Sequence, residues 1–494
     1  MNPTMKKIQA SELPSSGKTP LTPARNLARI APFIAFPLLF ITVFVYCIAL
    51  AHFYPKKFPT VDNAFQYRSL NRSNNSAPVA GNHSIVNLKN PPNRDINNRN
   101  PAPIAAGDDR RKSEETVMSI TDKNCNLFTG QWVRNHEGEP YYTNATCHAI
   151  QEHQNCLKFE RPDTDYLKWK WKPDGCELPA VDPSEFLQLV RGKAMAFVGD
   201  SVARNQLQSL VCILSKVTYP RDLSDPLDQN RRYEYREYNF NVSLFWSPYL
   251  VKTGGLTDDQ RRPFNLYLDE FDPLWPNEIA RFDYVIISAG HWFFRPTYFY
   301  VDRLLVGCLY CTESTIRQRS AGFSYRRAFR TAFRAIIEAE GFNGVVFLRT
   351  FSPSHFEGGR WNKGGSCPRT LPFGRNESAM ADYTADLYGI QLEELRIAER
   401  TAGNRHGGEV KLRAMDVTKA MQMRPDGHPS KYWQRPGANP TFGYDCVHWC
   451  LPGAIDTWNE FLMELLKREE LNTTSYVPTQ LRNKTKIFPI RVLL

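Results

Sequence analysis

The feature that most limits how this chain can fold is an apolar segment at residues 30–54, which contains no Asp, Glu, Lys or Arg. About 20 such residues suffice to cross the hydrocarbon core of a bilayer. A cleaved signal peptide has a shorter apolar core and a small-residue cleavage site, and this segment starts too late and runs too long for that. The sequence therefore predicts a single transmembrane anchor, preceded by a cytosolic tail at residues 1–29.

Two features after this segment indicate which side of the membrane the rest of the chain occupies. Ten of the eleven cysteines lie between residues 125 and 450, while Cys47 lies within the apolar segment. Eight N-x-[S/T] sequons also come after the segment, at Asn71, Asn74, Asn82, Asn144, Asn241, Asn376, Asn472 and Asn483. Together they indicate an oxidising secretory lumen, and hence a type II orientation with a luminal folded part.

Residues 55–120 are rich in Asn, Pro, Ser and Arg and poor in aliphatic residues. Such a composition cannot bury enough apolar surface to fold, so we expect a disordered stem between the anchor and the folded part.

The net charge of +11, from 62 Lys and Arg against 51 Asp and Glu, is basic but not extreme. A basic cluster, at Arg326, Arg327, Arg330 and Arg334, has helical spacing and lies beside apolar Phe329 and Phe333. That pattern favours a solvated face of an amphipathic helix over a nucleic-acid site. The sequence does not decide whether the net positive charge binds an anionic polymer or a membrane surface.

The folded part divides by composition into a Cys-rich subdomain at residues 121–180 and a larger domain at 181–494. The subdomain carries four cysteines and many aromatic residues, and we expect disulfides to attach it to the larger domain, in a pairing that the sequence does not give.

In the larger domain, short apolar runs at residues 194–198, 284–287, 345–348 and 412–417 alternate with helical patterns near 207–214, 329–337, 383–398 and from 452. This alternation predicts an α/β fold, a three-layer mainly parallel sheet covered on both faces. Sites in such folds form at the carboxyl ends of the strands.

Ser201 comes directly after the first of these strands in the sequence Gly199-Asp200-Ser201 and precedes a helix. On that turn a serine hydroxyl is exposed while backbone N–H groups face a developing oxyanion. Taken alone the motif is more typical of a helix cap, where Asp and Ser are favoured.

A second motif, Asp445-Cys446-Val447-His448-Trp449-Cys450, lies just before the last helix. An Asp three residues before a His can fix the imidazole tautomer, and the ring can then take and return a serine proton. The flanking cysteines predict a rigid loop, although a structural Asp in a disulfide-bounded loop gives the same pattern.

These motifs resemble the GDSL or SGNH superfamily of serine esterases and acyltransferases. Residues 199–205 and 445–453, with Cys125-Asn126-Leu127-Phe128 and Trp169-Lys170-Trp171-Lys172-Pro173, resemble more narrowly the plant trichome-birefringence-like family, over about residues 123–467. The resemblance implies a polysaccharide O-acetyltransferase of the Golgi membrane, which needs an acetyl donor, or a membrane protein that supplies it, and binds no cofactor.

The resemblance also implies roles for single residues. Ser201 would be the acyl-accepting nucleophile, His448 the base and Asp445 the group that orients it. The superfamily's usual Gly-x-Asn-Asp block is represented only by Gly290-His291-Trp292, so its Asn is absent and the backbone N–H of Ser201 carries more of the oxyanion. Arg204 and Asn205 are candidates to assist, or are packing groups on the adjoining helix.

An aromatic run at residues 291–300 is a candidate platform for sugar faces, with Arg295 bonding hydroxyls, although core packing explains several of its members. A Gly-rich stretch at 349–359 is either a cleft loop or a surface loop. Both stretches resemble the xyloglucan or mannan subgroup more than the xylan subgroup, and we expect xyloglucan as acceptor. An acetylesterase or a non-catalytic polymer-binding protein are the alternatives.

The pair Cys308-x-x-Cys311 has the spacing of a zinc ligand or redox pair, but no second well-spaced pair accompanies it. A structural disulfide is therefore expected, and the histidine spacing gives no support for a metal.

Overall fold

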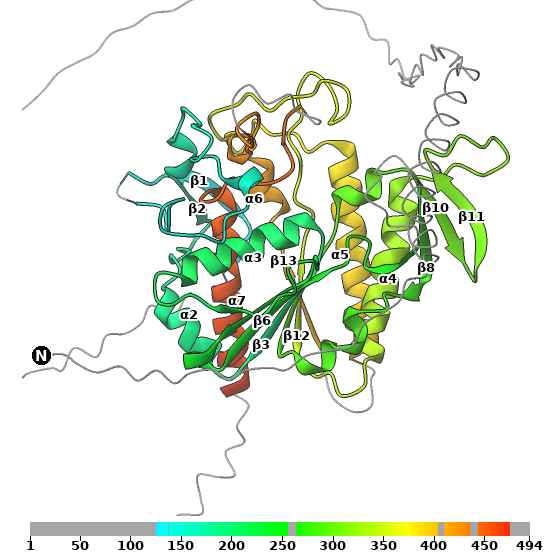
Figure 1. The fold of residues 1–494 in the computed structure, drawn as a ribbon, viewed down its shortest axis with the longest axis horizontal. Coiled ribbons are helices and arrows are strands. Elements are labelled where there is room, and N and C mark those ends of the chain that lie inside the picture. The colour runs from blue at the N-terminus through cyan, green and yellow to red at the C-terminus, as the bar shows by residue number, and fades with distance from the viewer. Residues whose placement is uncertain (1–124, 137, 255–262, 404–409, 435–442, 475–494) are drawn as a thin grey trace, which may run out of the picture. The chain divides into compact units, whose positions relative to one another are not determined.

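The computed structural model describes residues 125–136, 138–254, 263–403, 410–434 and 443–474, which belong to one compact unit (Figure 1). The predicted tail, anchor and stem at residues 1–120 lie outside the described residues. Within the described ranges, none of the helices has the length and hydropathy needed to span a bilayer.

A seven-stranded sheet forms the centre of the fold, in the order β13-β12-β9-β3-β6-β5-β4. Its first five strands are parallel, and the last two extend it as antiparallel edge strands. The strands are β3 (Ala194–Gly199), β4 (Arg221–Asp222), β5 (Arg231–Tyr235), β6 (Phe240–Trp246), β9 (Tyr284–Ser288), β12 (Val345–Arg349) and β13 (Lys411–Met415). The prediction of a mixed α/β fold is confirmed, with its four apolar runs as β3, β9, β12 and β13.

Side chains that alternate along β3 enter two separate cores, because successive residues of a strand point to opposite faces. Met195 and Phe197 pack in one core with α2 (Pro183–Leu189), α3 (Ser201–Leu214) and α7 (Thr457–Thr474). Ala196 and Val198 pack in the other with α4 (Ala321–Glu338) and α5 (Asp382–Ala402). Figure 1 shows these helices on either side of the sheet, so the domain has three layers.

The basic cluster on α4 is half-buried against α5, where Arg326 and Arg330 both bond the buried carboxylate of Glu394. Its helical spacing is thus confirmed, and part of its charge is neutralised inside the fold.

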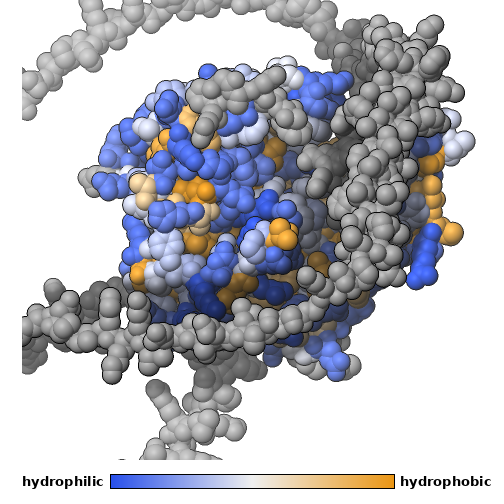
Figure 2. Space-filling view, in the orientation of Figure 1, coloured by the Kyte–Doolittle hydropathy of each residue, from blue (hydrophilic) through white to orange (hydrophobic). Residues whose placement is uncertain are grey.

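A second sheet, which the sequence did not predict, has the order β11-β10-β8-β7. Its strands are β7 (Val251–Gly254), β8 (Phe264–Phe271), β10 (Thr297–Val301) and β11 (Leu304–Leu309). The aromatic run ends in β10, where Phe299 is buried, and Phe293 is buried just before it. These two residues are core, as one of the two interpretations predicted. Leu304 and Leu305 lie exposed on the outer strand, along the apolar edge that Figure 2 shows beside an otherwise mostly hydrophilic face.

The Cys-rich subdomain is a hairpin of β1 (Gly130–Arg134) and β2 (Trp169–Pro173) with long loops. Cys125–Cys176 closes it, while Cys147–Cys212 and Cys156–Cys450 attach it to α3 and to the loop that carries His448. Trp132 adds a buried hydrogen bond to the carbonyl of Ala420 in α6 (Thr418–Gln422), 2.8 Å away. The predicted attachment by disulfides is confirmed.

The last helix starts later than its sequence pattern predicted, at Thr457 and not near Pro452. A 3₁₀ turn, η8 (Ala454–Asp456), precedes it, because the Asp456 carboxylate accepts hydrogen bonds from Gly453 N, Tyr142 and Ser209. The other 3₁₀ turns are η1 (Glu152–Gln154), η2 (Asp165–Leu167), η3 (Arg236–Tyr238), η4 (Trp275–Asn277), η5 (Ile279–Arg281), η6 (His291–Phe294) and η7 (Pro425–Gly427).

Candidate active site

Ser201 is the first residue of α3, directly after the carboxyl end of the central strand β3. Gly199 allows the tight approach there, since a Cβ on it would lie 2.0 Å from the carbonyl oxygen of Ser288. Asp200 caps the helix by accepting from Val202 N at 2.9 Å, and its second oxygen accepts from Gly290 N at 3.1 Å. The cap in this motif is thus Asp200, which leaves the Ser201 side chain free for another partner.

That partner is His448, whose Nε2 lies 2.8 Å from the Ser201 Oγ. On the other side of the ring, Nδ1 donates to Asp445 Oδ2 at 2.8 Å. The remaining carboxylate oxygen, Oδ1, accepts from the backbone N–H groups of Val447 and His448 at 3.1 and 3.0 Å. Three residues from two distant parts of the chain therefore form a continuous Ser–His–Asp hydrogen-bond chain, the geometry of a nucleophile, its base and an orienting carboxylate.

The charges at this site support each other. Burial alone would lower the pKa of His448, but the adjacent Asp445 carboxylate outweighs it and raises that pKa above its ordinary value. Burial likewise works to raise the pKa of Asp445, yet the His448 charge and hydrogen bonds hold it well below its usual range. Asp445 is therefore ionised, and it fixes the His448 proton on Nδ1, leaving Nε2 to accept from Ser201.

The loop that carries His448 is anchored from several elements. Cys446 is bonded to Cys367 and Cys450 to Cys156, so the two cysteines that flank His448 connect to separate parts of the molecule. Between them, Trp449 N donates to the Asn205 side chain at 2.8 Å and the Asn205 amide donates to Trp449 O at 3.3 Å. The loop is thus tethered on both sides of His448, which agrees with the rigidity that the flanking cysteines predicted.

Two of the candidate oxyanion donors are engaged elsewhere. The Asn205 amide is buried and used on the Trp449 backbone, so it holds the His448 loop and does not face the reacting atoms. The Gly290 N–H donates to Asp200. The Ser201 N–H, by contrast, has no hydrogen-bond acceptor among the described residues, which leaves it available to an oxyanion.

Arg204 and Arg295 belong to a ladder of cations and indoles beside Ser201. The Arg204 guanidinium lies 4.8 Å from the Trp246 ring, and Arg295 lies 3.7 Å from the Trp292 ring. The two indoles meet edge-to-face with centroids 5.8 Å apart. Buried nitrogens of both arginines, Nε of Arg204 and Nη1 of Arg295, have no partner among the described residues. We call these four residues the Arg–Trp ladder.

His291 points away from the ladder, because its Nε2 donates to Ser352 O at 2.9 Å. Burial lowers its pKa to about 4, so it is neutral. Ser352 is buried and also accepts from the Trp449 indole, so the start of the Gly-rich stretch 349–359 lies behind the site. The exposed part of that stretch begins only after His355.

Sequence reasoning missed three residues that surround the site. His153 packs edge-to-face on the His448 ring at 4.9 Å, and burial lowers its pKa to about 4. His428 stacks on Trp449 at 4.1 Å and donates from Nδ1 to His448 O at 2.7 Å. Trp246 completes the Arg–Trp ladder. Their positions in the subdomain, in the loop after α6 and in β6 share no spacing with the two motifs, so only the fold brings them together.

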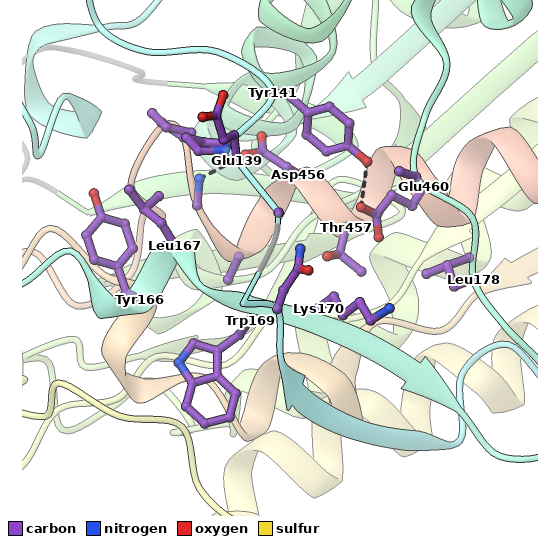
Figure 3. Close-up of a pocket in the computed structure, with 17 residues that line it drawn as sticks. Glu139, Tyr141, Tyr166, Leu167, Trp169, Lys170, Leu178, Asp456, Thr457 and Glu460 are labelled. Carbon is purple, nitrogen blue, oxygen red and sulfur yellow. Dashed lines mark hydrogen bonds between the residues drawn. The ribbon is translucent and has the colours of Figure 1, made fainter.

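A cavity of about 330 Å³ lies apart from these residues, between the Cys-rich subdomain and the start of α7 (Figure 3). Its lining includes Trp169, Lys170 and the Tyr141–Glu460 hydrogen bond of 2.7 Å, but not Ser201, Asp445 or His448. Elsewhere, Cys308 and Cys311 form the expected disulfide. No group of three or more His, Cys, Asp or Glu side chains within the described ranges has the arrangement of a metal site.

Comparison with known proteins agrees with this geometry. Residues 178–465 match the PC-Esterase family, described as a GDSL/SGNH-like acyl-esterase family found in Pmr5 and Cas1p, and residues 123–177 match the PMR5 N-terminal domain. The chain is 54% identical to protein trichome birefringence-like 19 of Arabidopsis thaliana, over 72% of this chain and 84% of that protein. It is 43% identical to xyloglucan O-acetyltransferase 4 of Populus trichocarpa, over 70% and 81%. With xyloglucan O-acetyltransferase 2 of Arabidopsis thaliana it shares 42% identity, over 72% and 86%. The chain therefore belongs to the GDSL/SGNH-like acyl-esterase family and, within it, to the trichome-birefringence-like proteins.

Proposed function

We propose that this protein is a polysaccharide O-acetyltransferase that moves acetyl groups to hydroxyls of xyloglucan through an acetyl-Ser201 intermediate. The observation that carries the proposal is the unbroken chain from Ser201 Oγ through His448 to Asp445, with both ring contacts at 2.8 Å. The names of the similar xyloglucan O-acetyltransferases favour a transferase with this acceptor.

In the first half-reaction, Ser201 Oγ attacks the acetyl carbonyl while its proton passes to His448 Nε2. The Ser201 N–H, which has no acceptor among the described residues, stabilises the oxyanion in this proposal, and the leaving group of the donor then takes the proton from His448. In the second half-reaction, His448 takes the proton of a sugar hydroxyl as that oxygen attacks the acetyl-enzyme. The proton returns to Ser201, and Asp445 stabilises the imidazolium in both halves.

The Arg–Trp ladder supports a glycan acceptor. Indole rings stack on the apolar faces of sugars, and guanidinium groups such as those of Arg204 and Arg295, which lie on Trp246 and Trp292, donate to hydroxyl oxygens. Arg204 is three residues after Ser201 on α3, so a sugar bonded there has its other hydroxyls near the nucleophile. A mannan or xylan acceptor has the same chemistry, and an assay with all three glycans separates them.

The proposed setting is the Golgi membrane, with residues 30–54 as a type II anchor and the described part in the lumen. Five disulfides among the described residues support an oxidising compartment. The sequon residues Asn144, Asn241 and Asn376 are all exposed, which suits glycosylation there.

The test uses the purified full-length chain with an acetyl donor and matched xyloglucan, mannan and xylan oligosaccharides, with products read by mass spectrometry. We expect xyloglucan to gain the mass of an acetyl group, and Ser201→Ala to abolish the gain. Loss of acetyl from acetylated oligosaccharides without any gain would replace the transferase with an esterase. Tight glycan binding without turnover in either direction would leave a polymer-binding protein.

A further inference from the structure

A buried pair of histidines lies directly behind the catalytic loop. His355 Nδ1 and His428 Nε2 are 2.7 Å apart, and the exposed fractions of the two residues are 7% and 1%. The other nitrogen of each ring contacts a backbone carbonyl. His355 Nε2 is 3.0 Å from Gln422 O, and His428 Nδ1 is 2.7 Å from His448 O.

The three short contacts of the two rings require three ring protons. A carbonyl oxygen only accepts, so His355 Nε2 and His428 Nδ1 each need a proton to donate. The contact between the two rings needs a third proton, because two ring lone pairs at 2.7 Å repel. Two neutral imidazoles carry only two protons between them. Three short contacts therefore need one proton more than a neutral pair has.

We propose that His355 and His428 share one extra proton in the folded protein, and that this imidazole–imidazolium pair holds the His448 carbonyl and so positions the catalytic loop. His428 acts through two contacts, the hydrogen bond to His448 O and the stacking on Trp449 at 4.1 Å. His355 adds a backbone bond from its N to Cys446 O at 3.2 Å. Both are positioning residues, since neither touches Ser201.

The surroundings limit the pair to a single extra proton. Burial is the largest influence on both rings and lowers their pKa values, that of His355 to about 4, which opposes a second charge. It does not remove the first, because losing the shared proton forces the two lone pairs together, so the pair titrates as a unit. The charged or titratable groups that face the pair are Asp426 with Arg424, Glu357 with Arg369, Arg161 with Asp163, Asp445, His448 and His291.

The test uses the linkage between protons and folding. Unfolded histidines lose their protons near pH 6.5. Above that pH the folded pair keeps one proton and the unfolded chain keeps none, so the protein loses stability as pH rises. If the folded pair were neutral, the stability of the protein would instead rise with pH up to about pH 7 and then stay constant.

The matched variant is His355→Asn, whose amide donates to His428 Nε2 without any extra proton. Unfolding by denaturant, with disulfides intact, gives the ratio of wild-type to variant unfolding constants from about pH 5 to 8.5. We expect this ratio to be flat below about pH 6 and to rise about tenfold per pH unit above pH 7. A ratio that is flat above pH 7 and changes below pH 6 would overturn the proposal.

His428→Gln supplies a neutral amide donor from the other side, and it replaces His355→Asn if that variant does not fold. If neither folds, wild-type protein with ¹⁵N-labelled imidazoles decides the question at about pH 8. Three of the four ring nitrogens of the pair carry a proton if the proposal holds, and two if it fails.

The positioning role rests on the proposed function and is read separately. Acetyl transfer by the wild type should hold while the stability ratio rises, because the folded pair keeps its proton there. It should decline only at the higher pH where the ratio levels off and the folded pair loses that proton, and this decline should be absent in His355→Asn. A proton found by the stability measurement, with identical alkaline activity profiles in both proteins, would refute the positioning role alone. Absence of all transfer would count against the proposed function while leaving the stability result intact.

Discussion

Replacing Asp445 with Asn separates the orienting role of this carboxylate from its structural role. Oδ1 accepts two backbone N–H bonds, from Val447 and His448, while Oδ2 accepts only from the His448 ring. The amide oxygen of Asn must therefore occupy the Oδ1 position, because an NH₂ there would oppose two N–H donors. Its NH₂ then faces His448 Nδ1 and donates to it.

The consequence is a loop of unchanged shape with the wrong tautomer. His448 Nδ1 becomes an acceptor and the ring proton moves to Nε2, which can no longer accept from Ser201. The equivalent tautomer change in a serine protease triad lowers kcat by about 10⁴-fold, and we expect a loss of that size here. Removing the carboxylate also removes the charge that raises the pKa of His448, so the acid limb of any residual activity should shift to lower pH.

The assay is kcat for acetyl transfer across pH, with thermal unfolding and circular dichroism to show that the variant is folded. Ser201→Ala and the double variant are the controls. If the residues act as one unit, the double variant is no slower than Ser201→Ala alone. A folded Asp445→Asn protein that keeps more than about a tenth of wild-type kcat would refute the assignment of Asp445 as the orienting group.

Three further predictions concern single contacts. Asn205→Leu leaves the buried Trp449 N–H and C=O unpaired, so it should lower the free energy of unfolding, measured with denaturant, by about 2–4 kcal/mol, and it should also lower kcat. A loss of unfolding free energy below about 0.5 kcal/mol would contradict this. Arg295→Gln removes the guanidinium that lies on the Trp292 ring and should raise KM for the acceptor more than it lowers kcat, measured with xyloglucan oligosaccharides; an unchanged KM would remove Arg295 from the acceptor site. Burial raises the pKa of Glu460 to about 7, so the folded state binds its proton more tightly and stability should fall as pH rises from about 4.5 to 7. Glu460→Gln should flatten that fall in a series of Tm values, and an unaltered slope would show that another group causes it.

The layout of the central sheet and the positions of Ser201, Asp445 and His448 could be predicted from the sequence because they depend on local patterns. Apolar runs define β3, β9, β12 and β13, and the two motifs each lie within a few residues. The second sheet escaped prediction although β8 alternates between buried and half-buried residues, and aromatic residues of β10 such as Phe299 suit a core and a sugar platform equally.

The surroundings of the site could not be predicted, for a physical reason. The role of a polar side chain depends on the groups opposite it, and for these residues those groups are fixed only by tertiary contacts. Asn205 was a reasonable oxyanion candidate four residues after Ser201, until the fold placed the Trp449 backbone against its amide. His428 lies 20 residues from His448 in sequence, yet it bonds that residue's own carbonyl.

The many anchors of the His448 loop explain why a base can be held accurately on irregular backbone. A loop without regular hydrogen bonding is ordinarily mobile, and a misplaced imidazole would lose the Ser201 contact. Here Cys446 and Cys450 bind two different segments, Asn205 pairs with both backbone groups of Trp449, and His428 holds the His448 carbonyl. Each anchor comes from a different part of the chain, so when one is lost the others still hold the loop in place. Such redundancy predicts that removing any one anchor lowers activity by much less than Asp445→Asn does, because only Asp445 also sets the tautomer.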